Sequence, residues 1–239
     1  MRTMKVRHAA LSDIGLMRKE NEDRFLLDEG RNLFGVADGI GGLPHGAEAA
    51  ALAVEGVSSR LAPRTPSLEE LKAAVKGANT DVRQAGHRLN PLHGIGSTLT
   101  LGCLMGRQLN LVHAGDSRCY VWRRGRITQA TIDHNVEHDP HFTLRFGMSE
   151  AVFERQRSAL TRCLGQLEEV ELECHKLELE QGDRVLFATD GLFRAIPEEE
   201  LAERLGNQEE PELALRELVT LANERGGADN ATGVLLYLE

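Results

Sequence analysis

The sequence predicts an α+β fold, in which helices cover antiparallel β-sheets. Many short segments have strand character and are separated by turn residues, whereas only a few long segments have helical spacing. Strand runs interspersed with a few long helices are typical of this fold class. The chain has 239 residues, of which 41% are hydrophobic, so it is large enough to bury a substantial core. No repeat, low-complexity tract or linker divides it, and we expect one domain over residues 1–239.

Three strands and two helices are predicted in the first part of the chain. The strands are KVRHAAL, RFLLDE and NLFGVAD. From Gly46, the segment AEAAALAVEGVSSRL is rich in alanine and has apolar residues at helical spacing. Pro63 and Pro66 then interrupt the chain, and Ser67 with Glu70 three residues later forms a capping-box pattern that starts a second helix. That helix directs one apolar stripe towards the core: Leu68, Leu71, Ala74, Val75, Ala78 and Val82.

Strand character returns at Ser97 in four consecutive segments, STLTLGCLM, QLNLVHAGD, RCYVWRRG and RITQAT. Gly106 and Gly125 lie at predicted hairpin turns, so we expect an antiparallel meander. Residues 134–158 are irregular, polar and rich in His and Arg, and we expect a mobile surface segment there. The other predicted elements are strands at LECHKLELE and DRVLFATD joined by a turn at Gln181 and Gly182, helices at 197–205 and 211–224, and a last strand at TGVLLYLE.

Charge and composition argue against several classes of protein. Lys and Arg number 28 against 37 Asp and Glu, a formal net charge of 28 − 37 = −9, whereas nucleic-acid-binding proteins usually carry a basic patch. The four cysteines form no C-x-x-C pair, which argues against a zinc ribbon or a thioredoxin-like site and fits a reducing compartment. No apolar run is long enough for a signal peptide or a membrane span. We therefore expect a soluble, cytoplasmic protein that binds neither nucleic acid nor membrane.

Aspartates mark the ends of several predicted strands. Asp38 follows FGVA, Asp116 follows LVHAG and Asp190 follows VLFAT, while Asp229 lies just before the last strand. Carboxylates at strand ends can converge from distant parts of the sequence, and hard cations such as Mg²⁺ and Mn²⁺ bind through oxygen ligands. A single Asp-Gly pair is common turn chemistry, but four aspartates in the same setting favour a metal site. The pattern indicates an oxygen-liganded metal ion and does not specify the reaction.

A series of motifs adds a family resemblance to this pattern. In chain order the motifs are GLMRKENEDRFLLDE, FGVADGIGG, GSTLTLGCL, LNLVHAGDSRCYVWRRGRITQATIDHN, LTRCLG, GDRVLFATDGLF and ADNATGVLL. With these motifs the sequence resembles the metal-dependent type-2C (PPM) Ser/Thr protein phosphatases, in their bacterial stand-alone form, over residues 12–236. The resemblance implies a four-layer α-β-β-α sandwich of two antiparallel sheets flanked by helices, with residues 134–158 as a flap.

The resemblance also implies roles for individual aspartates. Asp38 would bridge two metal ions, one of which would also bind the Gly39 carbonyl oxygen. Asp190 and Asp229 would hold the other ion. Asp116 would join Asp190 at a third, weaker metal site.

Residues of the motif RKENED complete the implied site. Glu22 and Asp23 correspond to the family's acidic pair, which binds metal directly or through ordered water. Arg18 corresponds to the phosphate-binding arginine, and its guanidinium would offer paired donors to phosphoryl oxygens. Outside this motif, a surface salt bridge with Glu22 at i, i+4 would be the simpler interpretation of Arg18. The resemblance thus implies Arg18 and Asp38 as catalytic residues.

The implied activity is hydrolysis of phosphoserine and phosphothreonine in proteins. A water activated by a pair of Mn²⁺ or Mg²⁺ ions would attack phosphorus, without a covalent phospho-enzyme. By family analogy, the partners would be phosphorylated proteins and a cognate Ser/Thr kinase in signal transduction, and we expect a monomer. One alternative is a catalytically inactive binding or scaffold module on the same fold. A second is a regulator that dephosphorylates one dedicated protein.

Two places depart from the family pattern. Ile40 stands where some members carry a histidine as a candidate general acid, so a proton for the leaving group would have to come from elsewhere. Phe153 and Glu154 stand in the region where bacterial members usually have His-Pro, so the flap is divergent. The expected metal ligands are intact, and substrate selection is the property that these departures affect.

Other signals in the sequence have simpler interpretations. His134, His138 and His141 could bind Zn²⁺ or Ni²⁺ from one helix, but Pro140 would interrupt that helix, so a solvated polar segment is favoured. The segments GIGGLPHG and GIGST lack the G-K-[ST] ending and the G-x-G-x-x-G spacing of nucleotide-binding loops. Packing roles within strands are predicted for Cys103, Cys119 and Trp122.

Overall fold

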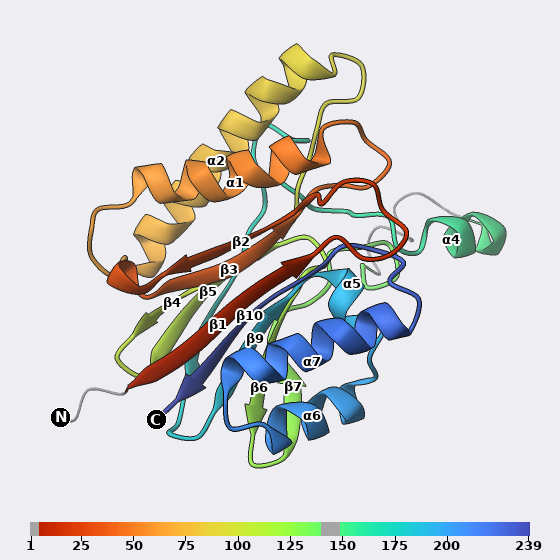
Figure 1. The fold of residues 1–239 in the computed structure, drawn as a ribbon. Helices are drawn as coiled ribbons and strands as arrows, with labels where there is room; N and C mark the ends of the chain where they lie inside the picture. The colour runs from red at the N-terminus through yellow and green to blue at the C-terminus, as the bar shows by residue number, and fades with distance from the viewer. Residues whose placement is uncertain (1–4, 140–148) are drawn as a thin grey trace.

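Two antiparallel five-stranded sheets form the centre of the protein. The computed structural model describes residues 5–139 and 149–239. The first sheet has the order β1-β10-β9-β6-β7 and the second has the order β2-β3-β4-β5-β8. Helices lie on the outer faces of both sheets (Figure 1). The predicted α+β sandwich of four layers is therefore confirmed.

The first sheet contains β1 (Val6–Asp13), β6 (Arg118–Arg123), β7 (Arg126–Gln129), β9 (Arg184–Ala188) and β10 (Ala231–Leu238). The second contains β2 (Asp23–Asp28), β3 (Leu33–Asp38), β4 (Leu99–Met105), β5 (Gln108–Ala114) and β8 (Glu173–Glu178). The helices of the described residues are η1 (Glu29–Arg31), α1 (Gly46–Arg60), α2 (Leu68–Leu89), α4 (Glu150–Gln156), α5 (Asp190–Phe193), α6 (Glu198–Asn207) and α7 (Pro211–Glu224).

Apolar side chains fill the space between the layers. Phe34 of the second sheet and Phe187 of the first belong to the cluster that lies between the sheets. Separate clusters join α1 and α2 to the second sheet, and α5, α6 and α7 to the first. Because the central strands are covered on both faces, they appear in the sequence as nearly continuous apolar runs. The predicted packing roles are confirmed, since Cys103 and Cys119 are buried and Trp122 Nε1 donates to the Ala202 carbonyl of α6 at 2.9 Å.

Helix α2 begins where the capping box predicts. The Ser67 Oγ accepts a hydrogen bond from the Glu70 N–H at 3.3 Å, and the Glu70 carboxylate accepts one from the Ser67 N–H at 2.9 Å. These two bonds satisfy backbone donors that the first turn of a helix leaves without partners. Five members of the predicted stripe are buried and Leu68 is partly buried; the buried ones are Leu71, Ala74, Val75, Ala78 and Val82.

The predicted meander is correct for the β4–β5 hairpin and for the β6–β7 hairpin at Gly125, and it is wrong at the connection between β5 and β6. Strand β5 pairs with β4 and β8, whereas β6 pairs with β7 and β9 in the other sheet. The chain changes sheets at Gly115, which has φ +120° and where a Cβ would lie 2.5 Å from the Thr98 Cβ. Both features favour glycine. Strands β8 and β9 are likewise in different sheets, although the predicted turn at Gly182 does lie in the short connection between them.

The described parts of the predicted surface segment, residues 134–139 and 149–158, differ from the prediction. His134, Asn135 and Val136 are buried. Residues 150–156 form α4, which lies at the end of the sandwich away from both chain termini (Figure 1). His141 lies outside the described residues. Among the residues that the structure describes, no helix is long and apolar enough to cross a membrane.

The capping box provides a test of the local folding signal. We expect Ser67→Ala to lower the free energy of unfolding by about 1 kcal/mol, because the Glu70 N–H loses its acceptor and the Glu70 carboxylate loses the Ser67 hydroxyl that helps to hold it. The matched control is Ser59→Ala, since the Ser59 hydroxyl only donates back to the Gly56 carbonyl near the end of α1. Urea denaturation of both variants measures the difference. Equal effects of the two substitutions would contradict the capping role.

Candidate metal centre

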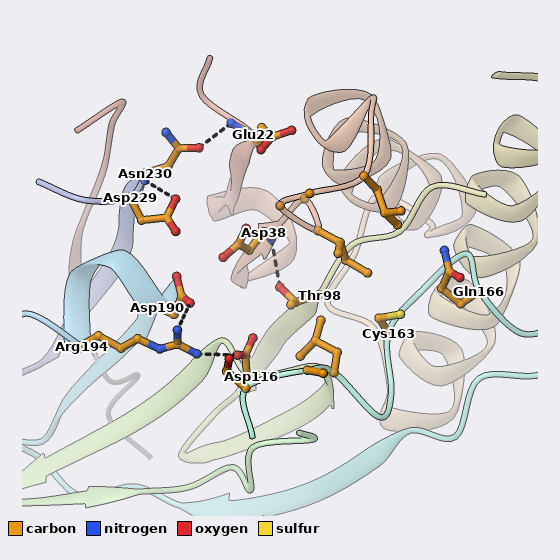
Figure 2. Close-up of a pocket in the computed structure, with 18 of the residues that line it drawn as sticks. Glu22, Asp38, Thr98, Asp116, Cys163, Gln166, Asp190, Arg194, Asp229 and Asn230 are labelled. Carbon is orange, nitrogen blue, oxygen red and sulfur yellow. Dashed lines mark hydrogen bonds and ion pairs between the residues drawn. The ribbon is translucent and has the colours of Figure 1, made fainter. Parts of the chain in front are cut away.

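The strand-end aspartates lie around one pocket. Asp38 ends β3, Asp116 lies between β5 and β6, Asp190 follows β9 as the first residue of α5, and Asp229 precedes β10. All of them line a cavity of about 710 Å³. Figure 2 shows their side chains facing a common space from different elements. Antiparallel neighbours run in opposite directions, so strands that end at this edge and strands that begin there can bring their terminal residues together.

Asp38 is fixed through its backbone. Its N–H donates to the Thr98 Oγ1 at 2.9 Å, and its carbonyl accepts from the Thr98 N–H at 2.8 Å and the Ser97 Oγ at 3.0 Å. The next residue, Gly39, approaches the start of α1 so closely that a Cβ would lie 2.2 Å from the Gly46 carbonyl oxygen. Only glycine fits there without movement of the backbone. These contacts leave the Asp38 carboxylate free to face the pocket.

Asp23 links the two sheets beside the pocket. It lies opposite Asp38 in the β2–β3 register. Its Oδ2 accepts a hydrogen bond at 2.8 Å from the hydroxyl of Thr189, the residue before Asp190. The same hydroxyl accepts from the Thr232 N–H of β10 at 3.0 Å. Asp23 therefore supports the site through hydrogen bonds and helps to hold the ends of β9 and β10 against β2.

Arg18 and Glu22 lie on the loop before β2, at the edge of the pocket. The Arg18 Nη2 donates to the Asp229 Oδ2 at 2.7 Å, and its Nη1 lies 3.7 Å from the Glu22 Oε2. Asn230 holds this loop, because its Oδ1 accepts from the Glu22 N–H at 2.8 Å and its Nδ2 donates to the Glu20 carbonyl at 3.0 Å. The sequence interpretation missed Asn230, for which the motif ADN was the available signal.

Arg194 is a second pocket residue that the sequence interpretation missed. Its Nη2 donates to the Asp116 Oδ2 at 3.0 Å, and its Nη1 lies 3.0 Å from the Asp190 Oδ2 (Figure 2). The spacing from Asp190 to Arg194 is i, i+4, which in the sequence looks like an ordinary helical ion pair. The contact with Asp116 depends on the change of sheet after β5 and has no local sequence signal.

Burial and crowding make the carboxylates difficult to ionise. Burial and the charges of Asp23 and Asp190 raise the pKa of Asp38 well above its ordinary value. Burial, with the charge of Asp190, raises the pKa of Asp116 to about 7, and burial raises the pKa of Asp23 to about 7. Burial also raises the pKa of Asp190, although Arg194 opposes the shift. A divalent cation would remove this penalty, because it favours the ionised form of every carboxylate around it.

The donor set of the pocket fits a hard divalent cation. Carboxylate and carbonyl oxygens are the ligands that Mg²⁺ and Mn²⁺ prefer. The Asp190 Oδ1 is buried and has no hydrogen-bond partner, so it is available to a ligand. Within residues 5–139 and 149–239, however, no three Asp, Glu, His or Cys side chains already stand close enough to hold one ion. Arg18 and Arg194 engage the carboxylates instead, so metal binding requires the side chains around the pocket to rearrange.

One wall of the pocket is apolar. Ile40 lies in it, with its backbone N–H donating to the Gly96 carbonyl at 2.9 Å. The Ile40 Cδ1 is so close to Gly96 that a Cβ there would lie 2.6 Å away. Arg155 and Gln156, at the end of α4, line another part of the pocket. Part of the predicted flap thus borders the site, and the position after Asp-Gly provides no acid.

His134 supports the turn that carries Asp116. It is buried, which contradicts the prediction of a solvated polar segment. Its Nδ1 accepts from the Gly115 N–H at 3.2 Å, its Nε2 lies 3.1 Å from the Glu173 Oε2, and its ring stacks on His113 with centroids 4.6 Å apart. Burial alone would raise the pKa of Glu173, but hydrogen bonds with His134 and His175 outweigh it and lower this pKa to about 2. This network lies directly beneath the turn that carries Asp116.

Comparison with known proteins identifies the family. Residues 18–229 match the Protein phosphatase 2C family, and the chain belongs to it. Serine/threonine protein phosphatase PstP of Mycobacterium tuberculosis is 37% identical over 235 residues, which cover 98% of this chain. The chain spans only 45% of the length of PstP. Serine/threonine phosphatase stp of Listeria monocytogenes is 29% identical over 94% of this chain and 93% of its own length.

Solved structures agree in fold over almost the entire chain. PppA of Pseudomonas aeruginosa is 30% identical and superposes with a TM-score of 0.85 over 99% of both chains. The catalytic domain of PstP, crystallised in complex with 2 manganese ions, is 34% identical and has a TM-score of 0.82 over 99% of both chains. The predicted family and fold are therefore confirmed, and the relatives are Ser/Thr protein phosphatases.

The crowded carboxylates provide a stability test. Because the pKa of Asp38 is raised in the folded state, its ionisation costs stability as the pH rises through that pKa. In EDTA at mildly alkaline pH, we expect Asp38→Asn to raise the free energy of unfolding by about 1 kcal/mol or more. Chemical denaturation measures this value, with Asp81→Asn, which removes an exposed partner of Arg60, as the control. A variant less stable than the unaltered protein in EDTA would contradict the electrostatic interpretation.

Proposed function

We propose that the protein hydrolyses phosphoserine and phosphothreonine in other proteins at a centre of two divalent ions, Mn²⁺ or Mg²⁺. The observation that carries this proposal is the convergence of four strand-end aspartates on one cavity, three of them with raised pKa: Asp38, Asp116 and Asp190. Family membership and the relatives named as Ser/Thr protein phosphatases support the reaction class.

The ligands would come from elements of both sheets. Asp38 would bridge the ions, the Gly39 carbonyl would bind one of them, and Asp190 and Asp229 would hold the other. Glu22 lies beside the start of α1, where a Cβ on Gly46 would be 2.4 Å from its Oε1, and it would complete the set on that side. Asp23 would act through hydrogen bonds and bound water, since its Oδ2 already accepts from Thr189.

Arg18 would bind the phosphoryl group of the substrate. Its side chain lines the pocket and lies next to Gly41, where a Cβ would be 3.3 Å from the Arg18 Nη1 and Nη2. The guanidinium can donate two parallel hydrogen bonds to phosphoryl oxygens, which fixes the group in one orientation. To do so it must exchange the Asp229 carboxylate for the substrate. A metal ion bound by the Asp229 carboxylate would favour that exchange, because it would release Arg18 from Asp229.

The metal ions and the protein chain would have different roles in the reaction. When bound, the two ions supply Lewis-acid catalysis, which lowers the pKa of water and offsets the charge on the phosphoryl oxygens. The chain orients the phosphoryl group through Arg18 and holds the carboxylates at fixed strand ends. Ile40 cannot donate a proton, so the leaving oxygen does not receive one from that position.

The remaining assignments belong to the same proposal. Substrates would be phosphorylated proteins, and a cognate Ser/Thr kinase would oppose the enzyme in cytoplasmic signalling. The chain would act as a monomeric single domain over residues 1–239. Arg155 and Gln156 of α4 line the pocket, so this part of the flap would contact the protein that carries the phosphate.

Metal dependence tests the reaction class. Hydrolysis of p-nitrophenyl phosphate and of a phosphothreonine peptide is expected with millimolar Mn²⁺ or Mg²⁺ and not in EDTA. We expect Asp190→Asn to lower kcat roughly a hundredfold or more, because an ion loses a charged ligand. The control Asp81→Asn removes an exposed carboxylate and is expected to leave the rate unchanged. No activity with either ion, or full activity of Asp190→Asn, would refute the proposal.

Substitution of Arg18 tests phosphate binding. Arg18→Lys keeps the positive charge but loses the paired donors, so we expect KM for the phosphothreonine peptide to rise roughly tenfold. Because the lysine still offsets phosphoryl charge, kcat should fall less than KM rises. Arg64→Lys, which changes an exposed partner of Glu70, is the matched control. An unchanged KM would show that Arg18 serves only its carboxylate partners.

A further inference from the structure

Arg194 contacts two carboxylates of the pocket at once. It caps the C-terminal end of α5, where its backbone N–H donates to the Asp190 carbonyl at 2.9 Å. Its guanidinium then reaches back into the pocket, with 3.0 Å contacts to the Oδ2 atoms of both Asp190 and Asp116. Figure 2 shows it spanning the gap between the two side chains. These are the two residues that the family resemblance assigns to a third, weaker metal ion.

We propose that Arg194 competes with a metal ion for Asp116 and Asp190 and so weakens the Mn²⁺ binding of the site that these two carboxylates would form. This inference rests on the proposed function, because it concerns an additional ion beside the same centre. The number of ions bound at a given Mn²⁺ concentration would then depend on the Arg194 side chain.

The contacts divide the two oxygens of Asp190 between different partners. The Oδ2 interacts with Arg194, whereas the buried Oδ1 has no partner. A core ion can therefore use Oδ1 without displacing the guanidinium. An ion shared between Asp190 and Asp116 would have to take the Oδ2 atoms that Arg194 occupies. Competition is thus expected at the third site and much less at the core site.

The charges favour reversible competition between Arg194 and a divalent cation over permanent exclusion of the cation. A guanidinium stays charged at any relevant pH, so it always offsets part of the repulsion between Asp116 and Asp190. A divalent cation carries twice that charge and would offset more of it. The Arg194 side chain is 50% exposed, so it can turn into solvent when an ion displaces it. Occupancy of the third site then depends on the Mn²⁺ concentration.

Arg18 has a different relation to the metal ligands. It interacts closely with Asp229 alone, at 2.7 Å, and its second contact, with Glu22, is 3.7 Å long. It comes from a loop outside the strands that carry the aspartates. Arg194 caps the short helix that begins at Asp190, four residues away, and this attachment keeps it beside the third site. Removal of its charge should therefore change ion binding locally.

Counting of bound ions tests the inference without any activity measurement. The full chain is stripped with EDTA, dialysed and titrated with MnCl2, and free Mn²⁺ is followed by its electron paramagnetic resonance signal. Arg194→Gln removes the charge and keeps the length, whereas Arg194→Lys keeps the charge. Asp116→Asn is added to Arg194→Gln to remove a ligand of the third site. Arg216→Gln, at an exposed ion pair with Glu212, controls for net charge.

We expect the third ion to bind roughly tenfold more tightly to Arg194→Gln than to the unaltered protein. Arg194→Lys and Arg216→Gln should resemble the unaltered protein, and the double variant should lose the third ion. Equal third-ion affinity of Arg194→Gln and the unaltered protein would overturn the inference and leave the proposed function intact. Absence of any Mn²⁺ binding by the unaltered protein would instead refute the proposed function. Circular dichroism checks folding, and Arg194→Ala replaces Arg194→Gln if the latter unfolds.

Discussion

Mutual repulsion among half-buried and buried carboxylates is the physical constraint on which the rest of this site depends. Several like charges in one desolvated pocket cannot all ionise unless positive charge is brought near them. In this protein Arg18 and Arg194 supply part of that charge, and the raised pKa values of Asp38 and Asp116 show that the compensation is incomplete. The repulsion that remains between the carboxylates would favour the binding of divalent cations in the pocket.

The sandwich holds this unfavourable arrangement in place. Asp38 is fixed by hydrogen bonds of its backbone to Ser97 and Thr98 at the start of β4, so its side chain remains free for the pocket. Asp23 joins the sheets through Thr189 at 2.8 Å. Because the apolar cluster between the sheets fixes their relative position, carboxylates from distant parts of the sequence cannot move apart to relieve their repulsion.

Local patterns in the sequence were sufficient for most elements and for the aspartates that line the pocket. The capping box at Ser67 and the aspartates after apolar strands are read from a few adjacent residues. The move of β6 into the other sheet could not be read in that way, because a Gly-Asp turn between two apolar strands also fits a hairpin. The burial of His134 was hidden by its polar neighbours, since its partner Glu173 is 39 residues away.

The two pocket arginines show why residue type alone does not define a role. Both guanidinium groups contact carboxylates of the site, yet their attachment to the fold differs. Arg18 lies on a loop tied by Asn230, so under the proposed function it would exchange Asp229 for a phosphoryl group without disturbing the strands. Arg194 caps α5 beside Asp190, so under the further inference its exchange partner would be an ion at the same carboxylates. In these two proposals, the backbone that carries each arginine, more than its charge, would separate substrate binding from control of the metal content.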